Sequence, residues 1–397
     1  MARVMQFLFG RGRAVPVLGA TEIIAWGTLI YPPVLIVPII AVERGWSLAF
    51  GMSGFSLALF TGGLVSPFVG RMIDERGGHV VMTAGLLLAA AVFMALIVAV
   101  HPIAYLAAWA MLGVAMAASL YDAAFASLTR VFGAMARRPL TAITLAGGFA
   151  STVSWPLTRL LVDLGGWRMA LAGFACLTAA VAAPLVFLAL PRTRASDDPV
   201  EREIGGAIKS VLPPRGRPFV FVAAAFASYA FVPSALAAHM LAIFQRHDIA
   251  PATAVVIGMI FGPAQVMARV CELTIGRRLA PIAIALGALG LLLAALAMLG
   301  LFGVTVPTAA LFALAFGTGN GLMTLARGNV PLSLFGPGGY GRMIGRIAGP
   351  SLVIQSAAPF TLAFVIDRSS DAVALALIGL FALFALVSLL SVNRTRR

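Results

Sequence analysis

The sequence predicts an all-α protein that crosses a lipid bilayer many times, and three observations carry this prediction. Of the 397 residues, 61% are hydrophobic and only 11% are charged, whereas about a quarter of a soluble domain is charged. Apolar runs of about 18 residues or more, the length that spans a bilayer as a helix, recur along the whole chain. These runs, such as Met82–Val100, lack the apolar–polar alternation of barrel strands, so the backbone must satisfy its hydrogen bonds in helices.

Glycine, proline and charged residues divide the apolar sequence into twelve predicted transmembrane helices. We expect them at residues 14–41, 48–70, 79–100, 103–131, 139–163, 167–190, 217–244, 251–272, 279–301, 307–330, 342–366 and 371–392. A single long polar connection, rich in proline and in charges of both signs, falls between the sixth and seventh helices. The sequence therefore predicts a six-helix bundle at 1–190, a cytoplasmic linker at 191–216 and a second six-helix bundle at 217–397.

A weak internal repeat supports this division into halves. Four pairs of identical residues are separated by the same 203 positions: Phe132 and Phe335, Gly133 and Gly336, Pro156 and Pro359, Thr158 and Thr361. A common separation across four pairs indicates two copies of one structural unit, and internal repeats are typical of membrane transporters.

The basic residues predict how the chain is oriented. With the N-terminus inside, 23 of the 28 basic residues lie on the cytoplasmic side, and five lie on the other: Arg44, Arg159, Arg168, Arg246 and Arg368. An excess of basic residues marks the cytoplasmic side. We therefore expect a multi-pass protein of the cell (inner) membrane, with both termini cytoplasmic. The net charge of +14 sets this topology, and we expect no nucleic-acid partner, because aromatic residues do not interleave with the basic ones.

Several classes of function are excluded by what the sequence lacks. The two cysteines stand apart inside apolar segments, which gives no metal-ligand spacing. The single lysine, Lys209, follows an isoleucine and lies in the linker, so it fits neither a phosphate-binding loop nor an intramembrane Schiff base. We predict a protein that is not an enzyme and has no cofactor and no metal. A membrane enzyme or a receptor is kept as a remote alternative.

The segment GRMIDERGGHVV, Gly70–Val81, places a dense charge cluster between the second and third helices. Gly70, Asp74 and Gly77 resemble the signature of the major facilitator superfamily in this loop, and Arg76 stands one place later than the basic residue of that signature. The resemblance implies two bundles around a central cavity, alternating access, and a cytoplasmic gate motif made by these four residues. On physical grounds Gly70 allows close helix approach, and Asp74 can pair with an arginine or with the positive N-terminus of the eleventh helix near Arg342.

The fifth helix carries a second resemblance, which bears on substrate. Residues 137–157, RRPLTAITLAGGFASTVSWPL, followed by Gly166–Arg168, resemble the monocarboxylate and oxalate/formate porters of that superfamily. The resemblance implies an organic anion as substrate, held by Arg269, with Gln265 where those porters have an aspartate. LYDAAFASL in the fourth helix and GNGLMTLARGNVPLSLFG in the tenth are similar to bacterial efflux members instead. They imply the alternative, efflux of a drug or of arsenite or another metalloid.

Ionisable residues inside membrane helices are costly and mark functional sites by default. Glu22 and Asp122 are our candidates for proton coupling. The candidates for substrate binding are Tyr31, Trp155, Tyr229, Gln265, Arg269, Asn320, Arg327 and Gln355. The alternative is that the acids and arginines form static ion pairs, with Glu272 as partner of Arg269. We thus predict a monomeric, proton-coupled secondary transporter of a small organic anion, whose partners are its substrate, protons and the bilayer.

Overall fold

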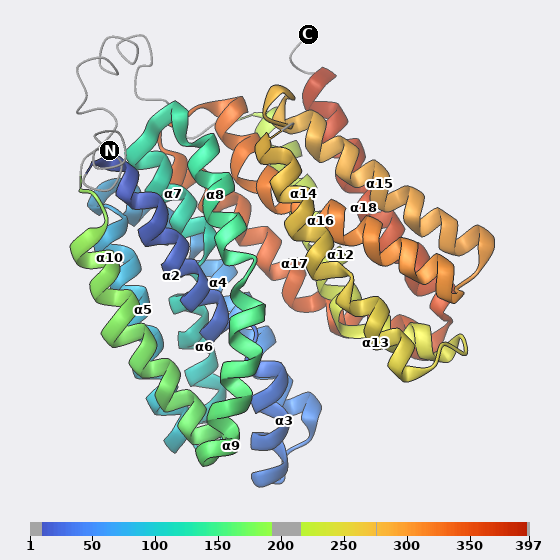
Figure 1. Ribbon diagram of the computed structural model, residues 1–397, viewed down its shortest axis with the longest axis horizontal. Helices are drawn as coiled ribbons and strands as arrows, with labels where there is room; N and C mark the ends of the chain where they lie inside the picture. Colours follow the sequence, from blue (N-terminus) through green and yellow to red (C-terminus); the bar gives the residue numbers. More distant parts are fainter. Residues whose placement is uncertain (1–9, 193–215, 275, 395–397) are drawn as a thin grey trace. The chain divides into compact units, whose positions relative to one another are not determined.

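The computed structural model describes residues 10–192, 216–274 and 276–394, and every regular element in those ranges is a helix (Figure 1). The chain divides into two compact units. The first comprises Met1–Pro214 and Phe335–Gly349, and the second comprises Arg215–Leu334 and Pro350–Arg397. The predicted linker at 191–216 lies almost wholly outside the described residues, so the predicted domain boundaries stay a prediction.

The helices of the first unit follow one another with short connections. They are α2 (Ala14–Leu29), α3 (Pro33–Glu43), α4 (Leu48–Arg76), α5 (Gly78–Val98), α6 (Pro102–Ser119), α7 (Tyr121–Phe132), α8 (Arg137–Gly147), α9 (Ala150–Cys176), a π-helical segment (Leu177–Ala182) and α10 (Ala183–Ala189). The later helices are α12 (Arg217–Arg246), α13 (Pro251–Met259), α14 (Phe261–Thr274), α15 (Pro281–Phe302), α16 (Val306–Phe335), α17 (Tyr340–Arg368) and α18 (Asp371–Arg394).

These helices give twelve membrane crossings in the described part of the chain. Ten helical stretches are long and apolar enough to cross a bilayer, but one of them, Pro102–Ala189, has 88 residues. At 1.5 Å per residue it would measure about 130 Å, against a hydrocarbon core of about 30 Å. The chain turns back within it at Gly133, where φ is +55°, and at Gly165–Gly166, where the backbone is not helical. This stretch therefore supplies three crossings, and the prediction of twelve helices is confirmed.

Four of the predicted helices are not continuous. The fifth breaks at Gly148 and Phe149, between α8 and α9. The first breaks between α2 and α3 at Pro32 and Pro33, and the eighth breaks at Ile260 between α13 and α14, three residues before a proline that lacks the amide hydrogen a helix needs. The fourth breaks at Leu120, whose ψ of −174° is extended. No glycine or proline stands at that position, so nothing in the local sequence foretold this break.

The internal repeat is confirmed by where the helices begin. Four pairs of helices start 203 residues apart: α2 and α12 at 14 and 217, α4 and α13 at 48 and 251, α5 and α15 at 78 and 281, α8 and α17 at 137 and 340. The glycines after α7 and α16, Gly133 and Gly336, both have positive φ, +55° and +78°. Glycine adopts this conformation at little cost and ends a helix there. The two halves therefore share one sequence register.

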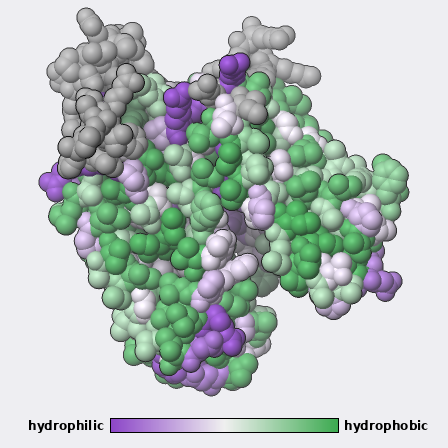
Figure 2. Space-filling view, in the orientation of Figure 1, coloured by the Kyte–Doolittle hydropathy of each residue, from purple (hydrophilic) through white to green (hydrophobic). Residues whose placement is uncertain are grey.

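The surface of the helices is as apolar as a bilayer requires. Large hydrophobic side chains such as Phe68 and Leu188 are exposed, and Figure 2 shows hydrophobic residues over the sides of the helices, with hydrophilic ones gathered mainly near helix ends. The interiors are packed with small and aliphatic residues, among them Ala89, Leu86 and Ala285. Lipid rather than water is the solvent that such a surface fits.

Candidate functional site

Asp74 holds the N-terminus of α17. Its two carboxylate oxygens accept hydrogen bonds from the main-chain N–H groups of Gly341 (2.8 Å) and Arg342 (2.7 Å). These amides belong to the first turn of α17, whose donors have no partner within the helix and carry the positive end of its dipole. The contact that the sequence predicted between Asp74 and the N-terminus near Arg342 is therefore present, within the first unit. We call it the Asp74 latch.

Glycines let α4 and α17 approach closely enough for this latch. A Cβ added to Gly70 would overlap the main chain of Gly341, and one added to Gly341 would overlap both Gly70 and the Asp74 carboxylate. One turn further along α17, a Cβ on Gly345 would overlap the carbonyl of Ser66. Small residues at every fourth position allow this kind of backbone contact between membrane helices.

The glycine contact leads to a first prediction. Gly341→Ala should push α17 away from α4 and break the Asp74 latch, because the added methyl group collides with main-chain atoms that cannot rotate away. Overpacking of this kind costs about 1–3 kcal/mol. Gly300→Ala, on α15, is the matched control, because a Cβ there meets nothing within 4 Å. A lower melting temperature of purified Gly341→Ala, with Gly300→Ala unchanged, is the expected result; equal melting temperatures would contradict it.

The rest of the charge cluster completes the end of α4. Gly77 ends the helix with φ +94°, a conformation that glycine adopts at little cost. Arg130 of α7 donates to the carbonyl of Ile73 at 3.1 Å and also to that of Asp74, so it caps the last turn of α4. Glu75 pairs with Arg71 at 2.6 Å and lies 3.7 Å from Arg342. Arg76, the last residue of α4, is exposed.

A second cluster in the first unit surrounds Glu22 of α2. Its side chain is fully buried, and one carboxylate oxygen accepts a hydrogen bond from the Trp26 indole N–H at 3.0 Å. Within the described residues the other oxygen, Oε1, is buried without a hydrogen-bond partner. The carboxylate of Asp122 in α7 lies near enough to act on Glu22 electrostatically. A buried, like-charged pair of carboxylates is costly when both are ionised.

A row of aromatic rings extends from this acidic pair. Trp26 lies 4.8 Å from Tyr121 and 6.3 Å from Tyr31, measured between ring centroids, and Tyr31 lies 6.3 Å from Trp155 at right angles. Trp155 is half exposed. Three helices and a break supply this row, because Tyr31 sits between α2 and α3. The structure thus brings together Glu22, Asp122, Tyr31 and Trp155, which the sequence suggested separately.

Two contacts join four of the candidate residues in the second unit. The Tyr229 hydroxyl of α12 donates to the Asn320 side-chain oxygen of α16 at 2.9 Å. On α14, Nη2 of Arg269 donates a hydrogen bond to the side-chain oxygen of Gln265, and the two atoms lie 3.3 Å apart. A Cβ on Gly321 would collide with the main chain of Gln265, so α16 approaches α14 at this level. Four of the predicted substrate-binding residues therefore lie on neighbouring helices.

The remaining candidates occupy other places in the second unit. Arg327 lies about two turns beyond Asn320 on α16. Gln355 of α17 accepts a hydrogen bond through its main-chain oxygen from the Ser234 hydroxyl at 2.9 Å. Glu272, the proposed internal partner of Arg269, is 5% exposed on α14, and Arg269 is 4% exposed. Among the described residues no group of three or more metal-ligating side chains occurs.

The structure adds residues that the candidate set omitted. Trp26 and Tyr121 join Glu22 to the predicted aromatic residues, and Arg130 caps the helix that carries Asp74. Tyr121 lies in the segment LYDAAFASL, which is similar to bacterial efflux members, but nothing in the sequence indicates that its ring contacts Trp26. Arg130 gives no signal either, because it acts on α4 from another helix.

Two six-helix repeats with buried charges and a carboxylate latch define a polytopic membrane transporter fold. The chain belongs to the Major Facilitator Superfamily, whose model matches residues 18–349. No curated protein sequence matches it. The recognition from the signature around Asp74 is therefore confirmed, and with it a multi-pass membrane protein of a transporter family.

Solved structures share the fold at low sequence identity. The human organic anion transporter MFSD10 is 19% identical with a TM-score of 0.73, and the match covers 95% of this chain and 99% of that one. The Escherichia coli fucose:proton symporter FucP is 12% identical with a TM-score of 0.70 over 95% and 98% of the chains. A bacterial homologue of the iron transporter ferroportin, in its outward-facing state, is 15% identical with a TM-score of 0.71 over 96% and 100%.

Proposed function

We propose that this protein is a proton-coupled secondary transporter of a small organic anion, such as a monocarboxylate. It works as a monomer in the cell (inner) membrane with both termini in the cytoplasm. The observation that carries the substrate class is Arg269, a guanidinium almost wholly buried on a membrane helix beside a neutral glutamine. An arginine stays charged and binds carboxylates with two parallel hydrogen bonds.

Three arguments support the anion. A buried arginine on a membrane helix marks a functional site by default, and its planar guanidinium fits a substrate carboxylate. Gln265, Asn320 and Tyr229 add neutral donors on neighbouring helices, which suit a small polar solute. One structural neighbour, human MFSD10, is itself named an organic anion transporter.

Glu22 and Asp122 are the proposed coupling groups. Two carboxyl groups close together in apolar surroundings favour a state in which they share a proton, because two ionised forms repel each other. A proton taken up there neutralises charge inside the membrane. We propose that release of this proton is coupled to the conformational change. The fucose:proton symporter among the structural neighbours shows that this fold supports such coupling in another protein.

The Asp74 latch is the proposed gate. Alternating access requires the cytoplasmic ends of helices from the two repeats to separate in one state. The bonds from Gly341 and Arg342 to Asp74 are local, charge-assisted and made to a helix terminus, so they can form and break as a unit. We propose that the latch is formed while the cytoplasmic side is closed.

A second candidate substrate is an organic cation leaving the cell, as a drug-efflux member would carry. The acidic pair beside the aromatic row of Trp26, Tyr31, Tyr121 and Trp155 favours it, because ring faces and carboxylates both attract cations. The metalloid alternative gains no such support, since Cys176 and Cys271 are both exposed and lie in different halves of the sequence.

A thermal-shift screen tests these alternatives. Purified protein is heated with monocarboxylates, lipophilic cations and arsenite at pH 5.5 and pH 7.5. A ligand that binds the folded state raises the melting temperature. Stabilisation by carboxylates alone supports the proposal, whereas stabilisation by cations alone replaces it with the second candidate.

Arg269→Lys provides a second prediction for the same site. Lysine keeps the charge but loses the planar pair of donors, so we expect carboxylate affinity to fall at least tenfold while the melting temperature without ligand changes little. Glu272→Gln, measured in parallel, tests the internal pair. If both variants lose stability equally and both bind carboxylate like the wild type, Arg269 is part of a static ion pair and not of the substrate site.

A further inference from the structure

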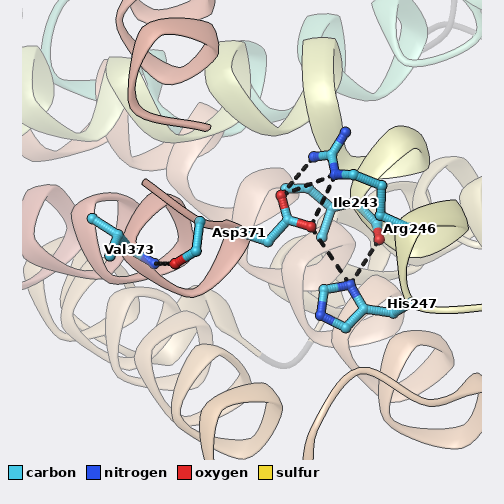
Figure 3. A network of polar contacts seen from close by, with 6 residues as sticks. Ile243, Arg246, His247, Asp371 and Val373 are labelled. Atoms are coloured by element: carbon cyan, nitrogen blue, oxygen red, sulfur yellow. Dashed lines mark hydrogen bonds and ion pairs between the residues drawn. The ribbon is translucent and has the colours of Figure 1, made fainter. Parts of the chain in front are cut away.

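In the second unit, an ion pair joins the end of one helix to the start of another. Arg246 is the last residue of α12, and Asp371 is the first residue of α18. Nη2 of Arg246 lies 2.6 Å from Oδ1 of Asp371, and Nε lies 3.0 Å from Oδ2 (Figure 3). His247 Nδ1 lies 3.6 Å from the same carboxylate, which is only 11% exposed. This two-pronged pair joins the seventh and twelfth crossings.

In the first unit, a corresponding ion pair joins two helices. Glu43 is the last residue of α3, and Arg168 follows the glycine break that starts the sixth crossing. Arg168 donates to both oxygens of Glu43, one of them at 3.0 Å, and the Trp167 indole N–H donates to the carboxylate at 2.6 Å. The Arg168 guanidinium also lies over the Trp167 ring, 4.2 Å from its centroid. This pair joins the first and sixth crossings.

The two pairs occupy the same places in the repeat but have opposite polarity. Glu43 and Arg246 are 203 residues apart, and so are Arg168 and Asp371, which is the separation of the matching helix starts. In the first half the acid stands on the earlier helix and the base on the later one. In the second half the base comes first.

The exchange of polarity changes what a wrong pairing would cost. Each repeat has six crossings, an even number, so equivalent helix ends emerge on the same side of the membrane. During assembly the end of α12 therefore competes with the end of α3 for the start of the sixth crossing. With the exchanged polarity, Arg246 would meet Arg168, and Glu43 would meet Asp371. Like charges brought together disfavour such pairings.

We propose that these two ion pairs form a pairing code, in which exchanged charges keep the closing helix of each half on its own bundle. A code of this kind is useful because equivalent helices of the two halves begin 203 residues apart, so that the order and limits of the helices alone discriminate weakly between the two bundles. Charge complementarity is a known means of selecting between similar helix partners. The pairs then specify assembly as well as contributing stability.

The test uses full-length variants that separate the code from the local bond. Glu43→Arg with Arg168→Glu keeps an opposite-charge pair in the first half but gives both halves the same polarity. Arg246→Glu with Asp371→Arg does the same from the second half. The fourfold variant restores opposite polarity. Glu43→Gln with Arg168→Gln is the neutral control, which removes the local bond without making a wrong pairing attractive.

The measurement is the yield of monodisperse protein by size-exclusion chromatography after extraction from membranes. We expect each twofold charge exchange to lower this yield about three- to tenfold, below that of the neutral control, and the fourfold variant to recover most of the wild-type yield. Twofold exchanges that match the wild type would overturn the proposal. So would a fourfold variant no better than the worse twofold exchange, because the loss would then be local.

Discussion

Replacing Asp74 by asparagine is expected to abolish transport while leaving the protein inserted in the membrane. Both carboxylate oxygens accept main-chain hydrogen bonds, from Gly341 and Arg342, and asparagine has only one side-chain oxygen. One amide of the first turn of α17 then lacks its acceptor, at a cost of about 1–3 kcal/mol. The helix terminus also loses its negative charge, which is worth about 0.3–1 kcal/mol.

The size of this effect decides its functional consequence. A latch weakened by about 2–3 kcal/mol shifts an equilibrium between closed and open states by roughly 30- to 150-fold. Alternating access needs a state in which the cytoplasmic side is stably closed. A variant that rarely occupies this state cannot complete the transport cycle. The protein should still fold, because the helices that carry Asp74 and Gly341 keep their other contacts, including the cap from Arg130.

Two measurements check the Asp74 prediction. Hydrogen exchange of the peptide that covers the start of α17 should become faster in Asp74→Asn, since its amides lose their acceptor. Uptake into proteoliposomes of whichever ligand stabilises the wild type should fall to background. Glu75→Gln is the control on the neighbouring residue: Glu75 makes an exposed pair with Arg71, worth little in water. Normal uptake by Asp74→Asn at normal expression would remove the latch from the mechanism.

The helices were predictable from the sequence because particular residue types mark where each one begins and ends. Apolar runs set the crossings, and glycine, proline and charge set their ends, as the matching starts of α4 and α13 show. The break at Leu120 was not predictable, because neither glycine nor proline stands at that position. The break at Pro32 had a visible signal in two consecutive prolines, but a membrane helix often tolerates proline.

The site was predictable only in part, for a similar reason. Asp74 could be assigned a partner because the family signature and the charge of a helix terminus both point to one. The glycines of α17 that face α4, Gly341 and Gly345, lie more than 260 positions from Asp74, and sequence alone does not show which helix faces which. Glu22 and Asp122 could be proposed from the sequence, because an ionisable side chain inside a membrane helix is costly and marks a functional site by default. The aromatic residues around them were visible only in three dimensions.

Glu22→Gln is expected to uncouple transport from the proton gradient. The glutamine side chain has nearly the same shape and keeps an oxygen that can accept the hydrogen bond from Trp26, so the local packing should survive. It cannot take up or release a proton. It also removes the repulsion between Glu22 and Asp122, so the variant should be at least as stable as the wild type. Stability and coupling are therefore expected to change in opposite directions.

The measurement is uptake driven by an imposed pH difference, compared with exchange of labelled for unlabelled ligand at equal pH. In Glu22→Gln the pH-driven uptake should fall at least tenfold, whereas exchange should continue, because exchange needs the substrate site and the moving helices but no net proton transfer. Glu22→Asp, which keeps the carboxyl group, should retain part of the pH-driven uptake. Asp122→Asn separates the two acids: if only that variant loses pH-driven uptake, the proton is carried by Asp122, and Glu22 serves to raise the cost of ionising it. If both neutral variants keep pH-driven uptake, the acidic pair is structural and the coupling group lies elsewhere in the chain.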